Sequence, residues 1–257
     1  MKLATWNVNS LKVRLEQLLD WIGSGAPEVI CLQETKLDDP KFPVEDIQDA
    51  GYQVVFSGQK TYNGVAIASR VAGADIVRGI PGFADEQKRV IAATIGTLRV
   101  INVYVPNGQS VNSDKYRYKL DWLSALSGWL GQQLKQYAEV AVLGDFNIAP
   151  EPRDVHDPKA WEGQVLFSQP ERAAFKAMID LGLVDSFRLF DQPEKAFTWW
   201  DYRLNAFPRG MGLRIDHILL SSALAQRCRG VSIIKDMRAL DRPSDHAPVV
   251  ADIADAV

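Results

Sequence analysis

Short apolar runs recur along the whole chain, and their length and composition are typical of β-strands. They cover residues 2–6, 29–33, 53–57, 65–69, 90–95, 98–105, 140–143, 214–220 and 249–253. The third run is followed closely by the fourth and the fifth by the sixth, which indicates antiparallel pairing. The pattern therefore predicts a protein rich in strands, with hairpins among them.

Three segments have helical periodicity instead. Leucine and isoleucine recur at spacings of three and four over residues 10–22, so a helix is predicted there, with Ser10 capping its first turn and Gly23 ending it. A longer helix is predicted over residues 115–137 and another over 171–181. The predicted fold is of the α/β (α+β) class, with two packed mixed β-sheets and helices on the outside.

Composition adds three limits. With 257 residues, 47% of them hydrophobic, the chain can fill one large core, and because no linker interrupts it we expect a single domain over residues 1–257. Cys31 and Cys228 do not form a disulfide framework, which suits a reducing compartment. No segment approaches the ~20 apolar residues of a membrane helix, and the first residues lack the apolar core of a signal peptide. We therefore expect a soluble, cytoplasmic protein without a membrane partner.

Four polar clusters stand at the ends of strand-like runs, where a sheet holds polar groups rigidly. They contribute asparagine, glutamate, aspartate and histidine but no cysteine, a set that is typical of a hard-metal hydrolase site rather than a zinc site. The clusters are Thr5-Trp6-Asn7-Val8-Asn9, Gln33-Glu34-Thr35-Lys36, Gly144-Asp145-Phe146-Asn147 and Ser244-Asp245-His246-Ala247-Pro248.

Two of these clusters allow a less specific interpretation. Glu34 ends an apolar run, where a carboxylate is costly unless a cation compensates it, so a metal ligand is favoured over a capping or turn role. Asp145 and Asn147 face the same way in an extended segment and could address one substrate atom together. Aspartate and asparagine also favour turns, and Pro150 follows shortly, so a turn explains this pair equally well.

His246 is the histidine with the strongest case for a chemical role. It follows Asp245, and Asp216 is a charged residue inside an apolar strand that needs a buried partner. Asp216 orienting His246 would satisfy that need. The other two histidines, His156 in a polar loop and His217 within a predicted strand, are expected to be structural.

Seven motifs, in this order along the chain, resemble those of the exonuclease III family of apurinic/apyrimidinic endonucleases. The glutamate motif and the Ser-Asp-His motif alone would indicate only the wider endonuclease/exonuclease/phosphatase superfamily, whereas the tryptophan-rich segment and Gly-Leu-Arg-Ile-Asp favour its DNA-repair branch. The motifs are Thr5-Trp6-Asn7-Val8-Asn9, Leu32-Gln33-Glu34-Thr35-Lys36, Tyr104-Val105-Pro106-Asn107-Gly108, Gly144-Asp145-Phe146-Asn147-Ile148-Ala149-Pro150, Phe197-Thr198-Trp199-Trp200-Asp201-Tyr202-Arg203, Leu213-Arg214-Ile215-Asp216 and Ser244-Asp245-His246-Ala247-Pro248.

The resemblance implies a four-layered α/β sandwich that incises duplex DNA 5′ to abasic sites and removes nucleotides or blocking groups from 3′ ends. It implies Mg²⁺, or Mn²⁺, as the cofactor. Asp145 would position or deprotonate the attacking water, and His246, oriented by Asp216, would donate a hydrogen bond or proton near the scissile phosphate. Tyr104 and Asn107 would contact the phosphate. The residues implied around the metal are Asn7, Glu34, Asp145, Asn147 and Asp245, with Asn147 also stabilising charge on the phosphate oxygens.

Contacts to DNA are expected from local basic and aromatic residues, because the formal net charge of −3 indicates no polyanionic partner by itself. Lys115 matches a phosphate-contacting lysine of the family across a one-residue gap, but an ordinary solvated helix start explains it equally well. Trp199 either lines a pocket for a sugar without a base or belongs to the core, since Trp199 and Trp200 face opposite sides of a strand. Backbone contacts, weakened by salt, are expected from Arg203, Arg209 and Arg214.

Some positions depart from the family pattern, and other functions stay open. Asn9 stands where some animal relatives carry aspartate, and Leu213 where they carry tryptophan, so the chain is more similar to bacterial members. A phosphodiesterase or phosphatase for lipid or inositol phosphates would use the same metal site. A DNA-binding relative without catalysis would normally have lost one of the acidic or histidine residues, and none is missing. No coiled-coil repeat is evident, so a monomer is expected.

Overall fold

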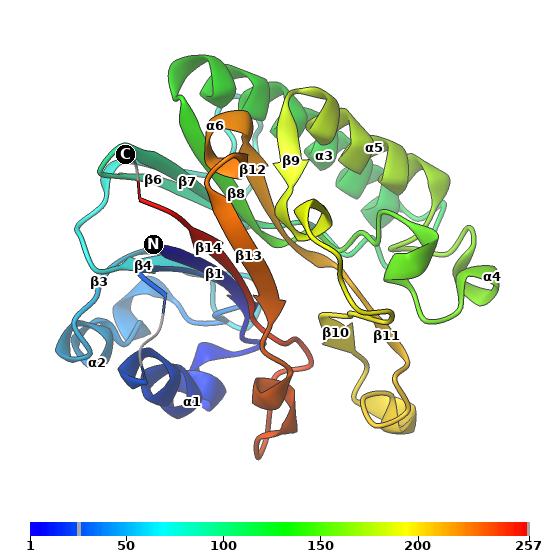
Figure 1. Ribbon diagram of the computed structural model, residues 1–257, viewed down its shortest axis with the longest axis horizontal. Coiled ribbons are helices and arrows are strands. Elements are labelled where there is room, and N and C mark those ends of the chain that lie inside the picture. Colours follow the sequence, from blue (N-terminus) through cyan, green and yellow to red (C-terminus); the bar gives the residue numbers. More distant parts are fainter. Residues whose placement is uncertain (25–26, 256–257) are drawn as a thin grey trace.

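Two six-stranded mixed sheets form the centre of the molecule (Figure 1). The computed structural model describes residues 1–24 and 27–255. The first sheet has the strand order β13-β14-β1-β2-β4-β3, and the second the order β5-β6-β7-β8-β12-β9. Within them, β1 and β2 are parallel, as are β7 and β8, whereas the other neighbours are antiparallel. The strands of the first sheet are β1 (Lys2–Asn7), β2 (Val29–Gln33), β3 (Gln53–Ser57), β4 (Val65–Ser69), β13 (Cys228–Ile233) and β14 (Val249–Ile253), and those of the second are β5 (Ala74–Arg78), β6 (Val90–Ile95), β7 (Leu98–Tyr104), β8 (Glu139–Asp145), β9 (Leu183–Asp185) and β12 (Asp216–Ser221).

Helices cover the outer face of each sheet, so the molecule has four layers (Figure 1). Helices α1 (Leu11–Gly23) and α2 (Val44–Asp49) pack on the first sheet, and α3 (Asp114–Gln136) and α5 (Gln169–Asp180) pack on the second. The predicted sandwich of two mixed sheets flanked by helices is therefore confirmed. The remaining short elements are α4 (Pro158–Trp161), α6 (Ser222–Ala225), the ribbon of β10 (Trp199–Trp200) and β11 (Gly212–Leu213), and the 3₁₀ turns Asp39–Lys41, Pro152–Asp154, Ser186–Leu189, Arg203–Asn205 and Lys235–Ala239.

The period-two alternation of the strands explains where the polar residues go. Leu3 on β1 and Leu143 on β8 belong to the apolar layer between the sheets, so residues two or four positions further along point into the same layer. At the end of each strand this inward position is polar: Asn7 on β1, Asp145 on β8. Asp216 opens β12 directly opposite Asp145 in the ladder. The layer between the sheets is thus apolar along the strands and polar at one edge.

Predicted boundaries are close to those observed. The three predicted helices begin and end within two residues of α1, α3 and α5. The capping role of Ser10 was wrong, because its side chain makes no capping hydrogen bond and its φ of 92° belongs to the sharp turn after β1. The predicted strand over residues 214–220 starts only at Asp216, since Arg214 turns into a buried ion-pair network.

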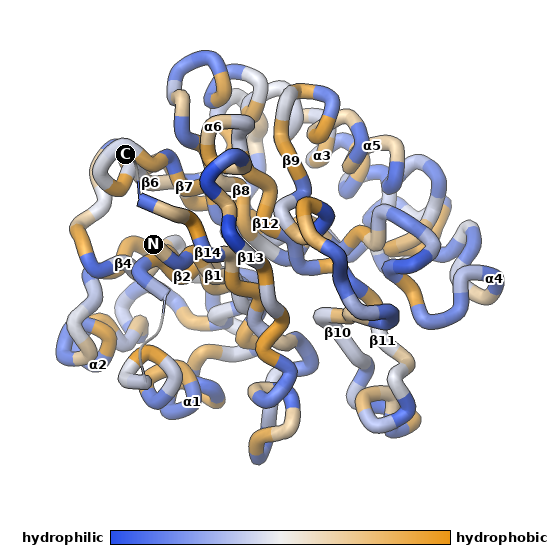
Figure 2. Tube along the Cα trace, in the orientation of Figure 1, coloured by the Kyte–Doolittle hydropathy of each residue, from blue (hydrophilic) through white to orange (hydrophobic). Residues whose placement is uncertain are grey.

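Several strands were not predicted, and their composition explains why. β13 contains arginine, glycine and serine and is half-exposed along most of its length. Figure 2 shows hydrophilic stretches at β13, whereas β12 of the other sheet is mostly hydrophobic. An edge strand with one open face needs fewer apolar residues, so its pattern of hydrophobic and polar positions is weak.

Of the helices in the described part of the chain, none is both long and apolar enough to cross a membrane.

Candidate active site

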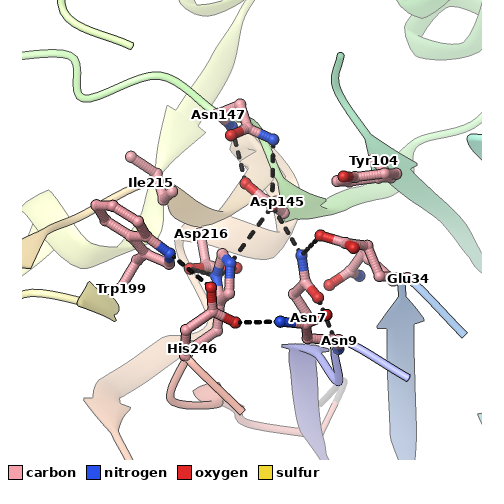
Figure 3. Close-up of polar contacts among 12 residues, drawn as sticks. Asn7, Asn9, Glu34, Tyr104, Asp145, Asn147, Trp199, Ile215, Asp216 and His246 are labelled. Atoms are coloured by element: carbon pink, nitrogen blue, oxygen red, sulfur yellow. Dashed lines mark hydrogen bonds and ion pairs between the residues drawn. The ribbon is translucent and has the colours of Figure 1, made fainter. Parts of the chain in front are cut away.

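The four polar clusters meet at the polar edge between the sheets (Figure 3). The Asn7 side-chain amide donates hydrogen bonds of 2.9 Å both to Glu34 Oε1 and to Asp145 Oδ2. The Asn9 amide donates a bond of 2.9 Å to Asp245 Oδ1. Two amides of the β1 end therefore connect carboxylates from the segments after β2, at the end of β8 and before β14.

His246 lies between two buried aspartates. Its Nδ1 is 2.9 Å and 3.1 Å from the two carboxylate oxygens of Asp216, and its Nε2 is 3.8 Å from Asp145 Oδ2. The backbone of the histidine loop is fixed as well, because Ser244 Oγ donates to the carbonyl of Asn7 and accepts from the His246 N–H. The predicted pairing of Asp216 with His246 is present, and it leaves Nε2 directed toward Asp145.

Burial and neighbouring charges shift the pKa values of Asp145 and His246 within this group of three residues. Burial raises the pKa of Asp145 to about 7; Asp216 acts in the same direction and His246 opposes it. Burial acts to lower the pKa of His246, but the carboxylates of Asp216 and Asp145 outweigh it and raise that pKa to about 10. The site therefore places a charged imidazolium beside a carboxylate that can accept a proton near neutral pH.

Asn147 combines the two interpretations that the sequence left open. Its backbone N–H donates to Asp145 Oδ1 over 2.9 Å at a φ of 49°, which is a turn closed by the aspartate side chain. Its side-chain amide also lies 3.2 Å from Asp145 Oδ2 and accepts, through its oxygen, a 3.1 Å bond from Asn107. The turn therefore brings Asn107, Asp145 and Asn147 together at one place.

Two of the carboxylates expected around a cation lie close together at the site. Glu34 and Asp145 both lie 2.9 Å from the Asn7 amide nitrogen, so two carboxylates converge there, and hard oxygen donors suit Mg²⁺ or Mn²⁺. Asp245 instead accepts hydrogen bonds from Asn9 and, over 3.0 Å, from Trp199. Within the described residues, the three-residue group of acidic or histidine ligands lying within 4.8 Å of one another is Asp145, Asp216 and His246.

Lys36 is a member of the site to which no role was assigned from the sequence. Its ammonium is 2.9 Å from Glu34 Oε2 and also contacts the side-chain oxygen of Asn9. Its position two residues after Glu34, in the same polar cluster, could have identified it as a site residue from the sequence. Tyr104 lies on this side of the site (Figure 3), and burial together with the Glu34 carboxylate raises its pKa well above the usual value.

Trp199 forms the opposite wall, next to Ile215 (Figure 3). It is half-buried and bonded to Asp245, whereas Trp200 is buried, as expected for one of the two. A mostly apolar cavity of about 410 Å³ adjoins it, lined also by His156 and Trp161. Trp199 is thus neither a fully buried core residue nor a fully exposed one. One face of its ring is accessible next to the carboxylates of the site.

The basic residues divide into exposed and buried ones. Arg203 is exposed and paired with Asp201, and Arg209 is exposed near the same turn. Arg214 is buried and bonded to Asp154 and Asp185, so the expectation that it contacts DNA was wrong. From the sequence, Arg214 was expected at the surface because its two partners, Asp154 and Asp185, lie in distant segments of the chain.

Lys115 lies at the start of α3 on the other side of the site. It is exposed and lines a groove of about 750 Å³ together with Asn107, Arg89 and Tyr62. Lys115 is therefore a solvated helix start that lines a polar groove, and its contact with phosphate stays a prediction. His217 is structural as expected: it is buried against Phe146, and burial lowers its pKa to about 4.

Comparisons with known proteins agree with this geometry. The sequence model of the endonuclease/exonuclease/phosphatase family matches residues 4–246. The chain belongs to this family. Its sequence is 39% identical to exodeoxyribonuclease III of Haemophilus influenzae, covering 98% of this chain and 99% of that protein. The resemblance to the exonuclease III family is thereby confirmed.

Two solved structures are very similar to this one. The 3′ phosphatase NExo from Neisseria, bound to a product DNA hairpin, is 46% identical and superposes with a TM-score of 0.97 over 99% of both chains. An AP endonuclease from Archaeoglobus fulgidus is 40% identical, with a TM-score of 0.95 over 99% of this chain and 100% of that one. The four-layered fold of the family is thus found throughout this chain.

Proposed function

We propose that this chain is a metal-dependent DNA repair nuclease that hydrolyses phosphodiester bonds 5′ to abasic sites and at the 3′ ends of duplex DNA. The observation that carries the proposal is the Asp216–His246 pair directed at Asp145, with the amides of Asn7 and Asn147 on the same carboxylate. The relatives are named as an exonuclease, a 3′ phosphatase and an AP endonuclease. Enzymes of all three kinds act on phosphate esters.

Glu34 and Asp145 are proposed to hold the cation together with Asn7, which bridges them. Their oxygen atoms suit Mg²⁺, with Mn²⁺ as a substitute. When bound, such an ion offsets the negative charge of the phosphate and of the attacking hydroxide. Asp245 supports this side of the site through Asn9, to which it is hydrogen-bonded.

The protein groups then divide the proton transfers between them. A water attacks phosphorus and its proton passes to Asp145, whose carboxylate is held in place by the amides of Asn7 and Asn147. Because Nδ1 of His246 is occupied by Asp216, its Nε2 is the atom that donates to a phosphoryl oxygen. Asn147 and Tyr104 add hydrogen bonds to the same phosphate as charge builds on it. The P–O bond to the leaving oxygen then breaks, and this oxygen takes up a proton from solvent water.

The DNA is proposed to lie across both walls of the site. On one side Asn107 and Lys115 would contact the strand along the polar groove. On the other, Trp199 would face the sugar that lacks a base, with Arg203 and Arg209 near the backbone. All these groups come from one chain, so a monomer suffices, and the cytoplasmic location that the buried free cysteines suit stays a prediction.

A cleavage assay tests the proposal. A labelled duplex with one abasic-site analogue and a second duplex with a recessed 3′ end are incubated with Mg²⁺, with Mn²⁺ and with EDTA. We expect metal-dependent incision 5′ to the lesion and trimming of the 3′ end, both abolished by Asp145→Asn. The matched control Asp46→Asn changes an exposed aspartate on α2 and should cleave normally. Absence of cleavage on both duplexes with any metal would refute the proposal.

A further inference from the structure

A lysine and a glutamate with no exposed surface lie directly behind the candidate site. Lys119 on α3 and Glu171 on α5 have side chains that are 0% exposed, and their charged atoms are 2.5 Å apart. Charged side chains are almost never buried completely unless a partner compensates them, so this pair needs an explanation.

All three hydrogens of the Lys119 ammonium have an acceptor. Besides Glu171 it donates to the backbone carbonyl of Asn147 over 2.7 Å and to that of Asn107 over 3.1 Å. An ammonium has three hydrogens, and each has a partner here. The two carbonyls belong to the two asparagines whose side-chain amides meet over 3.1 Å at the front of the site.

Glu171 connects this point to a third loop. Its carboxylate accepts from the backbone N–H groups of Leu166 and Ser168, at 3.0 Å and 3.1 Å, and from the Ser168 hydroxyl. The Ser168 hydroxyl in turn contacts Tyr116 on α3 over 2.6 Å. One ion pair therefore ties together the loops after β7, after β8 and before α5.

Stability alone does not account for such a pair. Removing two charges from water is costly, and apolar residues of similar volume often stabilise a protein as well or better. An apolar pair, however, has no donor for the carbonyls of Asn107 and Asn147. The loop after β8 has no regular ladder to satisfy its carbonyl, because Asn147 has a φ of 49° and ends the extended segment.

We propose that Lys119 is a positioning residue for the nuclease reaction: it fixes Asn107 and Asn147, through their carbonyls, so that their side-chain amides meet the phosphate in the transition state. Glu171 holds Lys119 in place and supplies its counter-charge. The proposal rests on the roles given above to the two asparagines. A displacement of about 1 Å in such groups can lower a rate about 100-fold, so a small loosening of the loops has a large effect.

The test replaces the pair without leaving a buried charge alone. In Lys119→Met/Glu171→Gln the methionine fills most of the lysine volume, and the amide oxygen in the place of Oε2 still accepts from Ser168, whereas the Leu166 N–H loses its acceptor Oε1. We expect kcat on the abasic duplex to fall about 30- to 100-fold, with KM changed less than about threefold, because the two asparagines lose their positioning while Lys115 and Arg89 of the groove remain.

The matched control is Gln133→Leu on the same helix. Gln133 is buried and accepts a 2.9 Å bond from Arg99 of β7, so it also ties α3 to the second sheet, but within the described residues it has no side-chain hydrogen bond to a residue of the site. Urea unfolding should show comparable stability losses for control and double variant, whereas only the double variant should lose kcat. Wild-type kcat in the double variant, or an equal loss of kcat in the control, would overturn the positioning role.

A second readout does not depend on activity. Hydrogen–deuterium exchange of residues 105–109 and 146–149 should rise in the double variant and stay unchanged in Gln133→Leu. Unchanged exchange in both segments would overturn the positioning role even if wild-type protein cleaved none of the DNA substrates. Wild-type inactivity together with faster exchange would reject the nuclease assignment while retaining the ordering of the loops by Lys119.

Discussion

The pair formed by Asp216 and His246 allows a quantitative test of the site. His246 is only 4% exposed, and its pKa is raised to about 10 because the nearby carboxylates, Asp216 foremost, outweigh its burial. Relative to an ordinary histidine near pH 6.5, this shift corresponds to roughly 5 kcal/mol at about 1.4 kcal/mol per pKa unit. Asp145 and Asp245 contribute as well, so we assign on the order of 2–4 kcal/mol to Asp216.

Asp216→Asn keeps the shape of this partner and removes its charge. Because the folded pKa of His246 lies above the unfolded one, the stability from this interaction is fully present below about pH 6.5 and is lost as the pH rises through about 10. The variant should therefore be about 2–4 kcal/mol less stable than wild type at pH 6, and the difference should shrink toward pH 10.

Urea unfolding of both proteins in EDTA at pH 6, 8 and 10 measures this difference, and NMR titration of the imidazole measures the pKa. The nuclease rate should fall about 100- to 10,000-fold, because the imidazolium near the phosphate is lost. A stability difference that is the same at all three pH values, or an imidazole that still titrates near pH 10, would refute the reasoning.

Three further outcomes are expected. Asp145→Asn should lower single-turnover cleavage at least about 1,000-fold while gel-shift affinity for DNA is retained, and a near-normal rate would exclude its role with the attacking water. Glu34→Ala should raise the Mg²⁺ concentration needed for half-maximal rate with an unchanged unfolding midpoint; normal activity at low Mg²⁺ would remove Glu34 from the metal site. Trp199→Ala should reduce abasic incision about tenfold or more with little change in thermal stability, whereas a collapse of stability would show that Trp199 is chiefly a core residue.

The strand ends of the site were predictable from the sequence, and the reason is geometric. Alternation along β1 and β8 places Asn7 and Asp145 in the inner layer once Leu3 and Leu143 are known to be buried. The pairing of Asp216 with His246 followed from the cost of a lone charge in an apolar strand.

Contacts between distant segments were not predictable in the same way. The burial of Lys119 and Arg214 depends on carboxylates that lie 52 residues away, for Glu171, and 60 residues away, for Asp154. A local pattern assigns a charged residue to the surface unless its partner is known. The bonds of Asp245 to Asn9 and Trp199 were hidden for the same reason, since they join segments from both halves of the chain.

The position of β14 has a consequence for biosynthesis. β1 is translated long before β14, yet it lies between β2 and β14 in the sheet, and β13 joins the sheet only through β14. One edge of β1 therefore stays open until β14 has been translated. Because Asp245 and His246 are in the segment just before β14, the polar centre formed by Asn7, Asp145, Asp216 and His246 is complete only when this gap closes.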